Sequence, residues 1–150
     1  MAANPITEPP APLIGWRLLA LFYDLWPVAA VWMAIAAAFL VAHGNRPLAA
    51  FSALQWLLWI ACWAATGAYA VISWRRGGQT LGMRPWRIRV VGRDGQAAAL
   101  PALLVRFGAG TLSLLLAGAG FWWAWIDRDR LTWHDRASGT RMIREPKRAG

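Results

Sequence analysis

A single carboxylate, that of Asp24, lies inside a hydrophobic stretch long enough to cross a lipid bilayer. From Leu18 to Ala42 the chain is almost entirely apolar, and Asp24 is its only charged residue. A charge at membrane depth costs free energy, so such residues usually pair with another group or take part in ion transfer. Asp24 is therefore the first candidate site, either for pairing within a helix bundle or for binding a proton or small cation.

A second candidate site is a row of polar side chains in the next apolar segment. The spacings along the row are seven, four, three and four residues, which places its members on one face of a helix. In lipid, such a face turns toward other helices. We expect the row to hold helices together, and a path for an ion is the alternative. The row comprises Gln55, Cys62, Thr66, Tyr69 and Ser73.

The remaining reactive side chains do not indicate catalysis. Cys62 is the only cysteine, and His43 and His134 are the only histidines, which is too few for a zinc site. The His134-Asp135 pair has no serine or cysteine nucleophile in a recognisable context. We therefore expect no metal, no cofactor and no enzymatic activity, and we expect nearby arginines to hold Asp135 in a structural turn.

Three apolar segments must position these residues, at 16–41, 51–74 and 102–126. Hydrophobic residues make up 58% of the chain and charged residues 15%, which fits a bilayer-embedded bundle better than a soluble domain. The first two segments are long enough to span a membrane, whereas Gly118 and Gly120 interrupt the third. We predict an all-α membrane protein with two transmembrane helices and a third, glycine-broken segment, which forms a re-entrant hairpin or a third span.

The basic residues predict which loops face the cytoplasm. Six arginines lie between residues 75 and 93, whereas the loop at 43–50 has one. Short cytoplasmic loops are rich in lysine and arginine, so residues 75–99 and the N-terminus are expected in the cytoplasm. Seven further basic residues follow Ile126, and three plain spans would place them outside. A re-entrant hairpin avoids this conflict, and we favour it.

We also predict two contacts between segments that are distant in the chain, the first favoured by the hairpin and the second expected in either arrangement of the third segment. The strand-like runs at 87–91 and 140–144 would pair in the cytoplasm. Asp24 and Arg106 lie at depths of roughly 10 and 7 Å, counted from Arg17 and Pro101 along helices that rise ~1.5 Å per residue. An ion pair between Asp24 and Arg106 would offset the cost of burying both charges, so we predict that pair.

Three sequence blocks in this order resemble the RDD family of small bacterial membrane proteins. They are Gly15–Ala20 followed by Asp24, Gly78–Arg84 followed by Ile88–Val91, and His134–Thr140. The family takes its name from one arginine and two aspartates, and the match assigns these to Arg17, Asp24 and Asp135. The resemblance implies a multi-pass protein of the bacterial cytoplasmic (inner) membrane, and transport, including sodium–proton exchange, has been proposed for the family.

These observations divide the chain into a flexible N-terminal tail (1–13), an RDD-like transmembrane domain (14–144) and a basic C-terminal tail (145–150). The net charge of +9 comes mainly from arginines at the ends of apolar segments. The expected partner is therefore the anionic headgroups of a bilayer rather than nucleic acid. We favour a structural or accessory membrane component. The alternative is transport of protons or small cations through Asp24, for which so small a chain would need to form a homo-oligomer.

Overall fold

The computed structural model describes residues 13–146, so most of both predicted tails, residues 1–12 and 147–150, lies outside it. Apart from a short helix at Trp133–Ser138, where a turn was expected, its helices and strands fall on the predicted segments. They confirm the mostly helical fold with one small sheet. The elements are α1 (Ile14–Ala42), α2 (Ala53–Gly77), β1 (Ile88–Gly92), α3 (Leu100–Leu115), α4 (Ala119–Ile126), α5 (Trp133–Ser138) and β2 (Thr140–Arg144).

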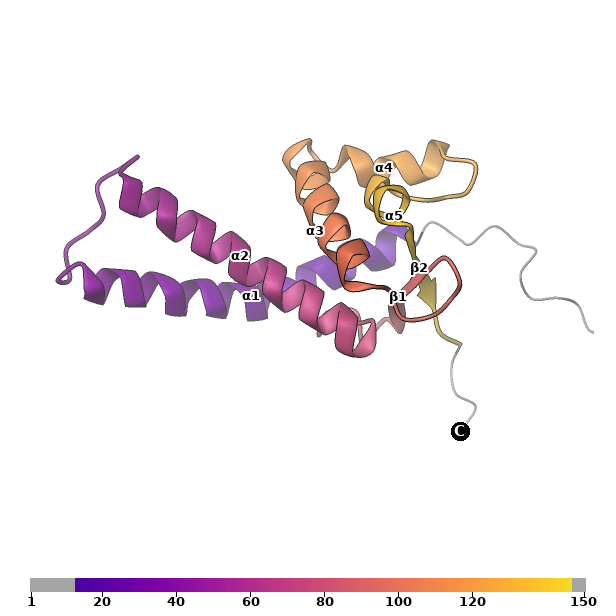
Figure 1. Ribbon diagram of the computed structural model, residues 1–150, viewed down its shortest axis with the longest axis horizontal. Helices are drawn as coiled ribbons and strands as arrows, with labels where there is room; N and C mark the ends of the chain where they lie inside the picture. Colours follow the sequence, from indigo (N-terminus) through magenta and orange to yellow (C-terminus); the bar gives the residue numbers. More distant parts are fainter. Residues whose placement is uncertain (1–12, 147–150) are drawn as a thin grey trace, which may run out of the picture.

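Helices α1 and α2 form a long hairpin, and the other elements gather at one end of it (Figure 1). Each of the two helices is long and apolar enough to cross a membrane. Large apolar side chains cover the hairpin surface, and among them Met33 is 73% exposed and Trp26 is 70% exposed. Water-soluble proteins rarely expose apolar patches of this extent. The hairpin thus presents the surface that a bilayer requires.

Local sequence signals set the ends of α2. The Ser52 side chain accepts a hydrogen bond from the backbone N–H of Gln55 at 3.2 Å, which caps the first turn. Gly78 ends the helix in the left-handed conformation, with φ at 69°, which glycine adopts at little cost. The chain then turns back into the loop that precedes β1.

The two strands pair antiparallel, with Ile88 opposite Arg144 and Val90 opposite Met142. This confirms the predicted pairing of residues 87–91 with 140–144, and the first strand begins one residue later than predicted. Ile88, Val90 and Met142 are buried, and they pack with residues of α1, α2 and α3 in one hydrophobic core. The sheet therefore fixes the C-terminal part of the chain against the base of the hairpin.

The third apolar segment is broken, as its glycines predicted. Helix α3 ends at Leu115, Ala117 and Gly118 take left-handed backbone angles, and α4 leaves at 98° to α3. A bend of this size excludes one straight span. Helix α3 runs across the α1–α2 hairpin rather than along it (Figure 1).

Helix α3 buries two polar side chains, and both α3 and α4 expose large apolar side chains. Arg106 and Ser113 of α3 are buried, whereas Leu115 is 78% exposed and Ile126 of α4 is 79% exposed. The three tryptophans of α4 (Trp122, Trp123 and Trp125) are exposed too. This arrangement is the reverse of the usual pattern in water-soluble proteins, and it suits a surface that faces lipid.

Candidate functional site

Asp135 lies at the centre of a buried charge cluster that joins α5 to α1 and α3. Arg17 of α1 contacts one carboxylate oxygen at 2.8 Å, and Arg106 of α3 contacts the other at 2.5 Å. The side chains of Arg17 and Arg106 are 3% and 2% exposed, and that of Asp135 is fully buried. One carboxylate thus connects three helices that are far apart in the sequence.

The local structure of α5 fixes the position of this carboxylate. The Thr132 hydroxyl accepts a hydrogen bond from the backbone N–H of Asp135, and the carboxylate accepts one from the backbone N–H of Thr132, which forms a capping box. Arg17 also donates to the Thr132 hydroxyl at 3.2 Å, and Arg106 donates to the Thr140 hydroxyl at 2.7 Å. The cap and the two arginines therefore hold Asp135 from several sides.

The cluster carries one net positive charge, because two guanidinium groups face a single carboxylate. Burial alone would raise the pKa of Asp135, but the charges of Arg106 and Arg17 hold that pKa well below its usual range. Burial, reinforced by the same two arginines, lowers the pKa of His134 to about 3. Asp135 is therefore ionised and His134 is neutral at physiological pH.

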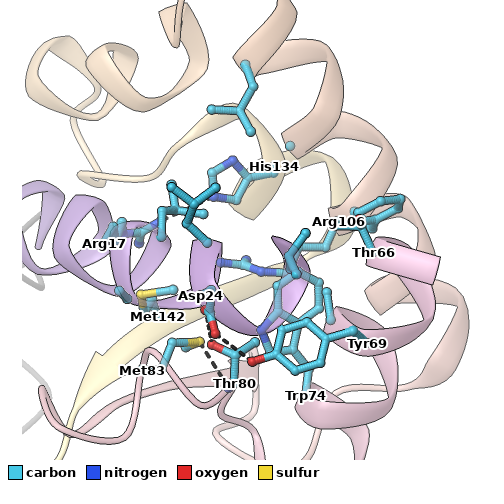
Figure 2. Close-up of a pocket in the computed structure, with 18 of the residues that line it drawn as sticks. Arg17, Asp24, Thr66, Tyr69, Trp74, Thr80, Met83, Arg106, His134 and Met142 are labelled. Carbon is cyan, nitrogen blue, oxygen red and sulfur yellow. Dashed lines mark hydrogen bonds between the residues drawn. The ribbon is translucent and has the colours of Figure 1, made fainter. Parts of the chain in front are cut away.

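Asp24 makes a separate set of contacts with the loop after α2 (Figure 2). Its Oδ1 accepts hydrogen bonds from the Tyr69 hydroxyl at 2.6 Å and from the backbone N–H of Gly82 at 2.8 Å. Its Oδ2 accepts a hydrogen bond from the Thr80 hydroxyl. The backbone N–H of Leu81 donates in turn to the Tyr69 oxygen at 3.1 Å. Asp24 thus fastens α2 and the following loop to α1.

A cavity of about 250 Å³ borders both groups of residues (Figure 2). Arg17, Asp24, Tyr69, Arg106 and His134 contribute to its wall, and most of the other lining residues are apolar. Among residues 13–146, no cluster of three or more His, Cys, Asp or Glu side chains could hold a metal ion. Of the predicted site residues, Arg17, Asp24, Thr66, Tyr69 and Arg106 line this cavity, whereas Gln55, Ser73 and Asp135 do not. The charged residues form two distinct bonding networks beside it.

All of the positions that make these contacts except Thr140 fall within one family match. Residues 11–139 match the family model described as the RDD family. The chain belongs to the RDD family. Comparisons with curated proteins and with solved structures found no match. In this RDD protein Arg17 and Asp135 bind each other, whereas Asp24 binds neutral donors. These are the three residues that the resemblance assigned to the family motif.

The predicted ion pair between Asp24 and Arg106 is wrong. Within residues 13–146, Arg106 forms its ion pair with Asp135, and Asp24 accepts hydrogen bonds from uncharged groups. Counting residues along a helix gives a depth, but it does not show which way each side chain points around the helix axis. The fold of α5 brings Asp135 to Arg106. The expectation that arginines hold Asp135 is confirmed, and both arginines are remote from it in sequence.

The predicted polar row of α2 divides between different contacts. Tyr69 binds the carboxylate of α1 described above, and the Thr66 hydroxyl accepts a hydrogen bond from Trp32 Nε1 of α1 at 2.9 Å. These contacts hold helices together, as expected. Gln55 instead accepts a hydrogen bond from the backbone N–H of Phe51 at the start of α2, while Cys62 is buried and Ser73 is half-buried.

Thr80, Gly82, Thr132 and Thr140 have roles that the sequence interpretation missed. Each supplies a donor or acceptor to one of the two motif carboxylates or to its arginines. Thr132 could have been predicted as a helix N-cap, because threonine three residues before aspartate is a common pattern at the start of a helix. Thr80 and Gly82 lie within the second sequence block that resembles the family, but neither residue type by itself indicates a contact with Asp24.

The low pKa of His134 leads to a prediction about pH. An unfolded histidine binds a proton below pH ~6.5, whereas His134 in the folded protein does so only near pH 3. As the pH falls from about 6.5 toward 3, the unfolded state binds a proton at His134 and the folded state does not. The free energy of unfolding therefore falls progressively over this range and is unaffected by the titration of His134 above it. Between about pH 6.5 and 4.5, the loss from His134 should be on the order of 2–3 kcal/mol.

Thermal unfolding of the purified protein in detergent, followed across this pH range, measures the effect. The His134→Gln variant should show a flatter dependence of stability on pH than the wild type. His43→Gln, in the exposed loop between α1 and α2, serves as the matched control and should keep the wild-type slope. Equal slopes for wild type and His134→Gln would contradict the prediction.

Proposed function

We propose that this RDD protein is a structural or accessory component of the bacterial cytoplasmic (inner) membrane, that it crosses the membrane more than once, and that it is not an enzyme. The observation that carries the proposal is the bridging of Arg17 and Arg106 by Asp135. Two of the three motif charges thus contact each other in the interior, and the third fastens a loop. Removing one partner of a buried ion pair typically costs about 3–5 kcal/mol, so these charges serve the integrity of the fold.

The lengths of the helices support a position for these charges near one face of the bilayer. Asp24 lies about 18 residues before the end of α1, and Tyr69 lies about 16 residues after the start of α2. At ~1.5 Å per residue these distances are roughly 27 and 24 Å, in a hydrocarbon core about 30 Å thick. The Asp135 cluster then lies at or beyond the membrane boundary, together with the exposed Arg75 and Arg76, which suits contact with anionic headgroups.

The sheet supports the re-entrant form of the third apolar segment. Strand β1 precedes α3, β2 follows α4 and α5, and the two strands are hydrogen-bonded to each other. The chain therefore enters and leaves the α3–α4 segment on the same side. A complete third crossing would separate β1 from β2. We thus place both basic regions and the C-terminus in the cytoplasm, where the positive-inside rule expects them.

Reporter fusions test this placement. A reporter enzyme that is active only outside the cytoplasm should be silent when it is fused after Gly150. The same reporter inserted into the loop at residues 43–50 should be active and provides the control. Activity at the C-terminus would contradict the re-entrant arrangement and favour a third span.

A second candidate function is transport of protons or small cations by a homo-oligomer that uses Asp24. The observation in its favour is that oxygen atoms of Asp24, Tyr69 and Thr80 gather at the cavity wall, since hard cations prefer oxygen ligands. The observation against it is that three donors already satisfy the Asp24 carboxylate. A proton or cation would have to displace them during each cycle.

Flux measurements separate the two functions. Purified protein is placed in lipid vesicles, a proton or sodium gradient is imposed, and flux is compared with that of protein-free vesicles. We expect no added flux from the wild type or from Asp24→Asn. Flux that is present in the wild type, absent in Asp24→Asn and retained in Asp129→Asn, where the carboxylate is 66% exposed, would overturn the structural proposal.

A further inference from the structure

The cavity opens toward the surface that faces lipid. At its mouth, Leu21 and Leu25 of α1 are 40% and 57% exposed, and Leu114 of α3 is 54% exposed. These side chains continue the apolar outer surface of α1 and α3 described above. Deeper inside, the aromatic rings of Phe107 and Phe121 line the wall. A molecule would therefore reach this cavity from the hydrocarbon of the bilayer rather than from water.

Three hydrogen-bond donors of residues that line the cavity, Arg17 Nε among them, lack an acceptor within residues 13–146. The buried Nε1 of Trp74 and Nδ1 of His134 have no partner among residues 13–146, and His134 is only 5% exposed. Arg17 approaches the Nε2 atom of His134 at 3.4 Å, and a guanidinium group can only donate, so Nε2 is the acceptor and Nδ1 carries the proton. A buried donor without a partner costs about 1–3 kcal/mol, which an oxygen acceptor on a bound molecule would recover.

We propose that the cavity binds one acyl chain of a glycerolipid, with an ester carbonyl oxygen accepting a hydrogen bond from Trp74 Nε1. The apolar wall suits the hydrocarbon chain, and the free N–H group of Trp74 suits the carbonyl. The cavity volume of about 250 Å³ is below the ~300–1,000 Å³ typical of pockets that enclose a drug-sized ligand, so part of one chain fits rather than a whole lipid. This inference rests on the membrane placement proposed above, but it holds for a structural component and for a transporter.

Two glycines of α3 provide a matched pair of variants. Gly110 lines the cavity and Gly108 is exposed on the outer face, and an added Cβ would meet no atom within 4 Å at either position. Gly110→Leu should therefore place its side chain in the cavity, and Gly108→Leu should add the same side chain outside it. Thermal unfolding of both variants shows whether they fold like the wild type.

The probe is a diester phospholipid with a photoreactive diazirine in one acyl chain, mixed into phosphatidylethanolamine–phosphatidylglycerol vesicles that contain the protein. After illumination, mass spectrometry compares labelling at the cavity residue Phe121 with labelling at the outer residue Leu115. Gly110→Leu should lower this ratio about ten-fold, equivalent to a loss of roughly 1.4 kcal/mol of binding, and Gly108→Leu should leave it unchanged. Label at Leu115 without label at Phe121 in the wild type, or an unchanged ratio in Gly110→Leu, would overturn the proposal. Absence of label at Leu115 would instead overturn the membrane placement.

An ether-linked version of the probe tests the carbonyl contact and needs no change to the protein. It lacks the ester carbonyl, so its labelling ratio in the wild type should be several-fold lower than that of the ester probe. In Trp74→Phe, which keeps an aromatic ring but loses the N–H group, the difference between the two probes should shrink. Equal ratios for the two probes in the wild type would refute the carbonyl contact.

Discussion

Asp135→Asn is expected to destabilise the protein more than any other substitution of a single carboxylate. The change leaves Arg17 and Arg106 buried, at 3% and 2% side-chain exposure, with no opposite charge beside them. Loss of one partner from a buried ion pair costs about 3–5 kcal/mol, and one carboxylate here serves two partners. The total stability of a domain is only about 5–15 kcal/mol, so much of the variant should fail to accumulate in the membrane.

Thermal unfolding in detergent, followed by size-exclusion chromatography of a fluorescent fusion, measures this loss. Asp129→Asn is the matched control, because its carboxylate is 66% exposed and its ion-pair partner is the half-exposed side chain of Arg136. Exposed ion pairs contribute about 0–1 kcal/mol, so this variant should melt close to the wild type. Equal melting temperatures for Asp135→Asn and Asp129→Asn would show that the buried cluster does not stabilise the fold.

Gly82→Ala is expected to detach the loop after α2 from α1. A Cβ atom at Gly82 would lie 2.2 Å from the backbone oxygen of Ala20 and 2.8 Å from the backbone nitrogen of Asp24. Both atoms belong to a helix backbone that cannot give way, so the loop must move. Overpacking typically costs about 1–3 kcal/mol, and the hydrogen bonds from Gly82 and Thr80 to the Asp24 carboxylate would be lost as well, at about 1.5–3 kcal/mol each.

Limited trypsin digestion detects this movement, and the melting temperature measures the loss of stability. Arg84 and Arg87 lie in the affected loop, so Gly82→Ala should be cut there faster than the wild type. Gly77→Ala is the control, because a Cβ at Gly77 would meet nothing within 4 Å. Wild-type resistance to trypsin in Gly82→Ala would mean that the loop does not depend on its close approach to α1.

The sequence predicted the parts of this fold that depend on local patterns. Two apolar runs of sufficient length became α1 and α2, and the glycines at 118 and 120 marked a break that the structure places at residues 116–118. Alternation of side chains along residues 87–91 indicated a strand, and the predicted partner strand lies beside it. Each of these features is encoded within a few neighbouring residues, which is why sequence reasoning reached them.

The partners of the motif charges could not be reached in the same way. Arg106 was assigned to Asp24 from their depths, but the direction of its side chain depends on how α3 crosses the hairpin. Asp135 reaches Arg106 only because the chain folds back after α4 and a capping box starts α5 at Trp133. These contacts join elements far apart in the chain, so they follow from tertiary packing and not from spacing.

A pair of double-mutant cycles tests most directly whether Asp135, rather than Asp24, is the counter-ion of Arg106. The first cycle combines Asp135→Asn with Arg106→Met, the second combines Asp24→Asn with Arg106→Met, and the free energy of unfolding in detergent is measured for every variant. We expect a coupling energy of about 1–3 kcal/mol in the first cycle and additivity within about 0.5 kcal/mol in the second. Additivity in the first cycle with strong coupling in the second would contradict the central role of Asp135 and restore the ion pair between Asp24 and Arg106.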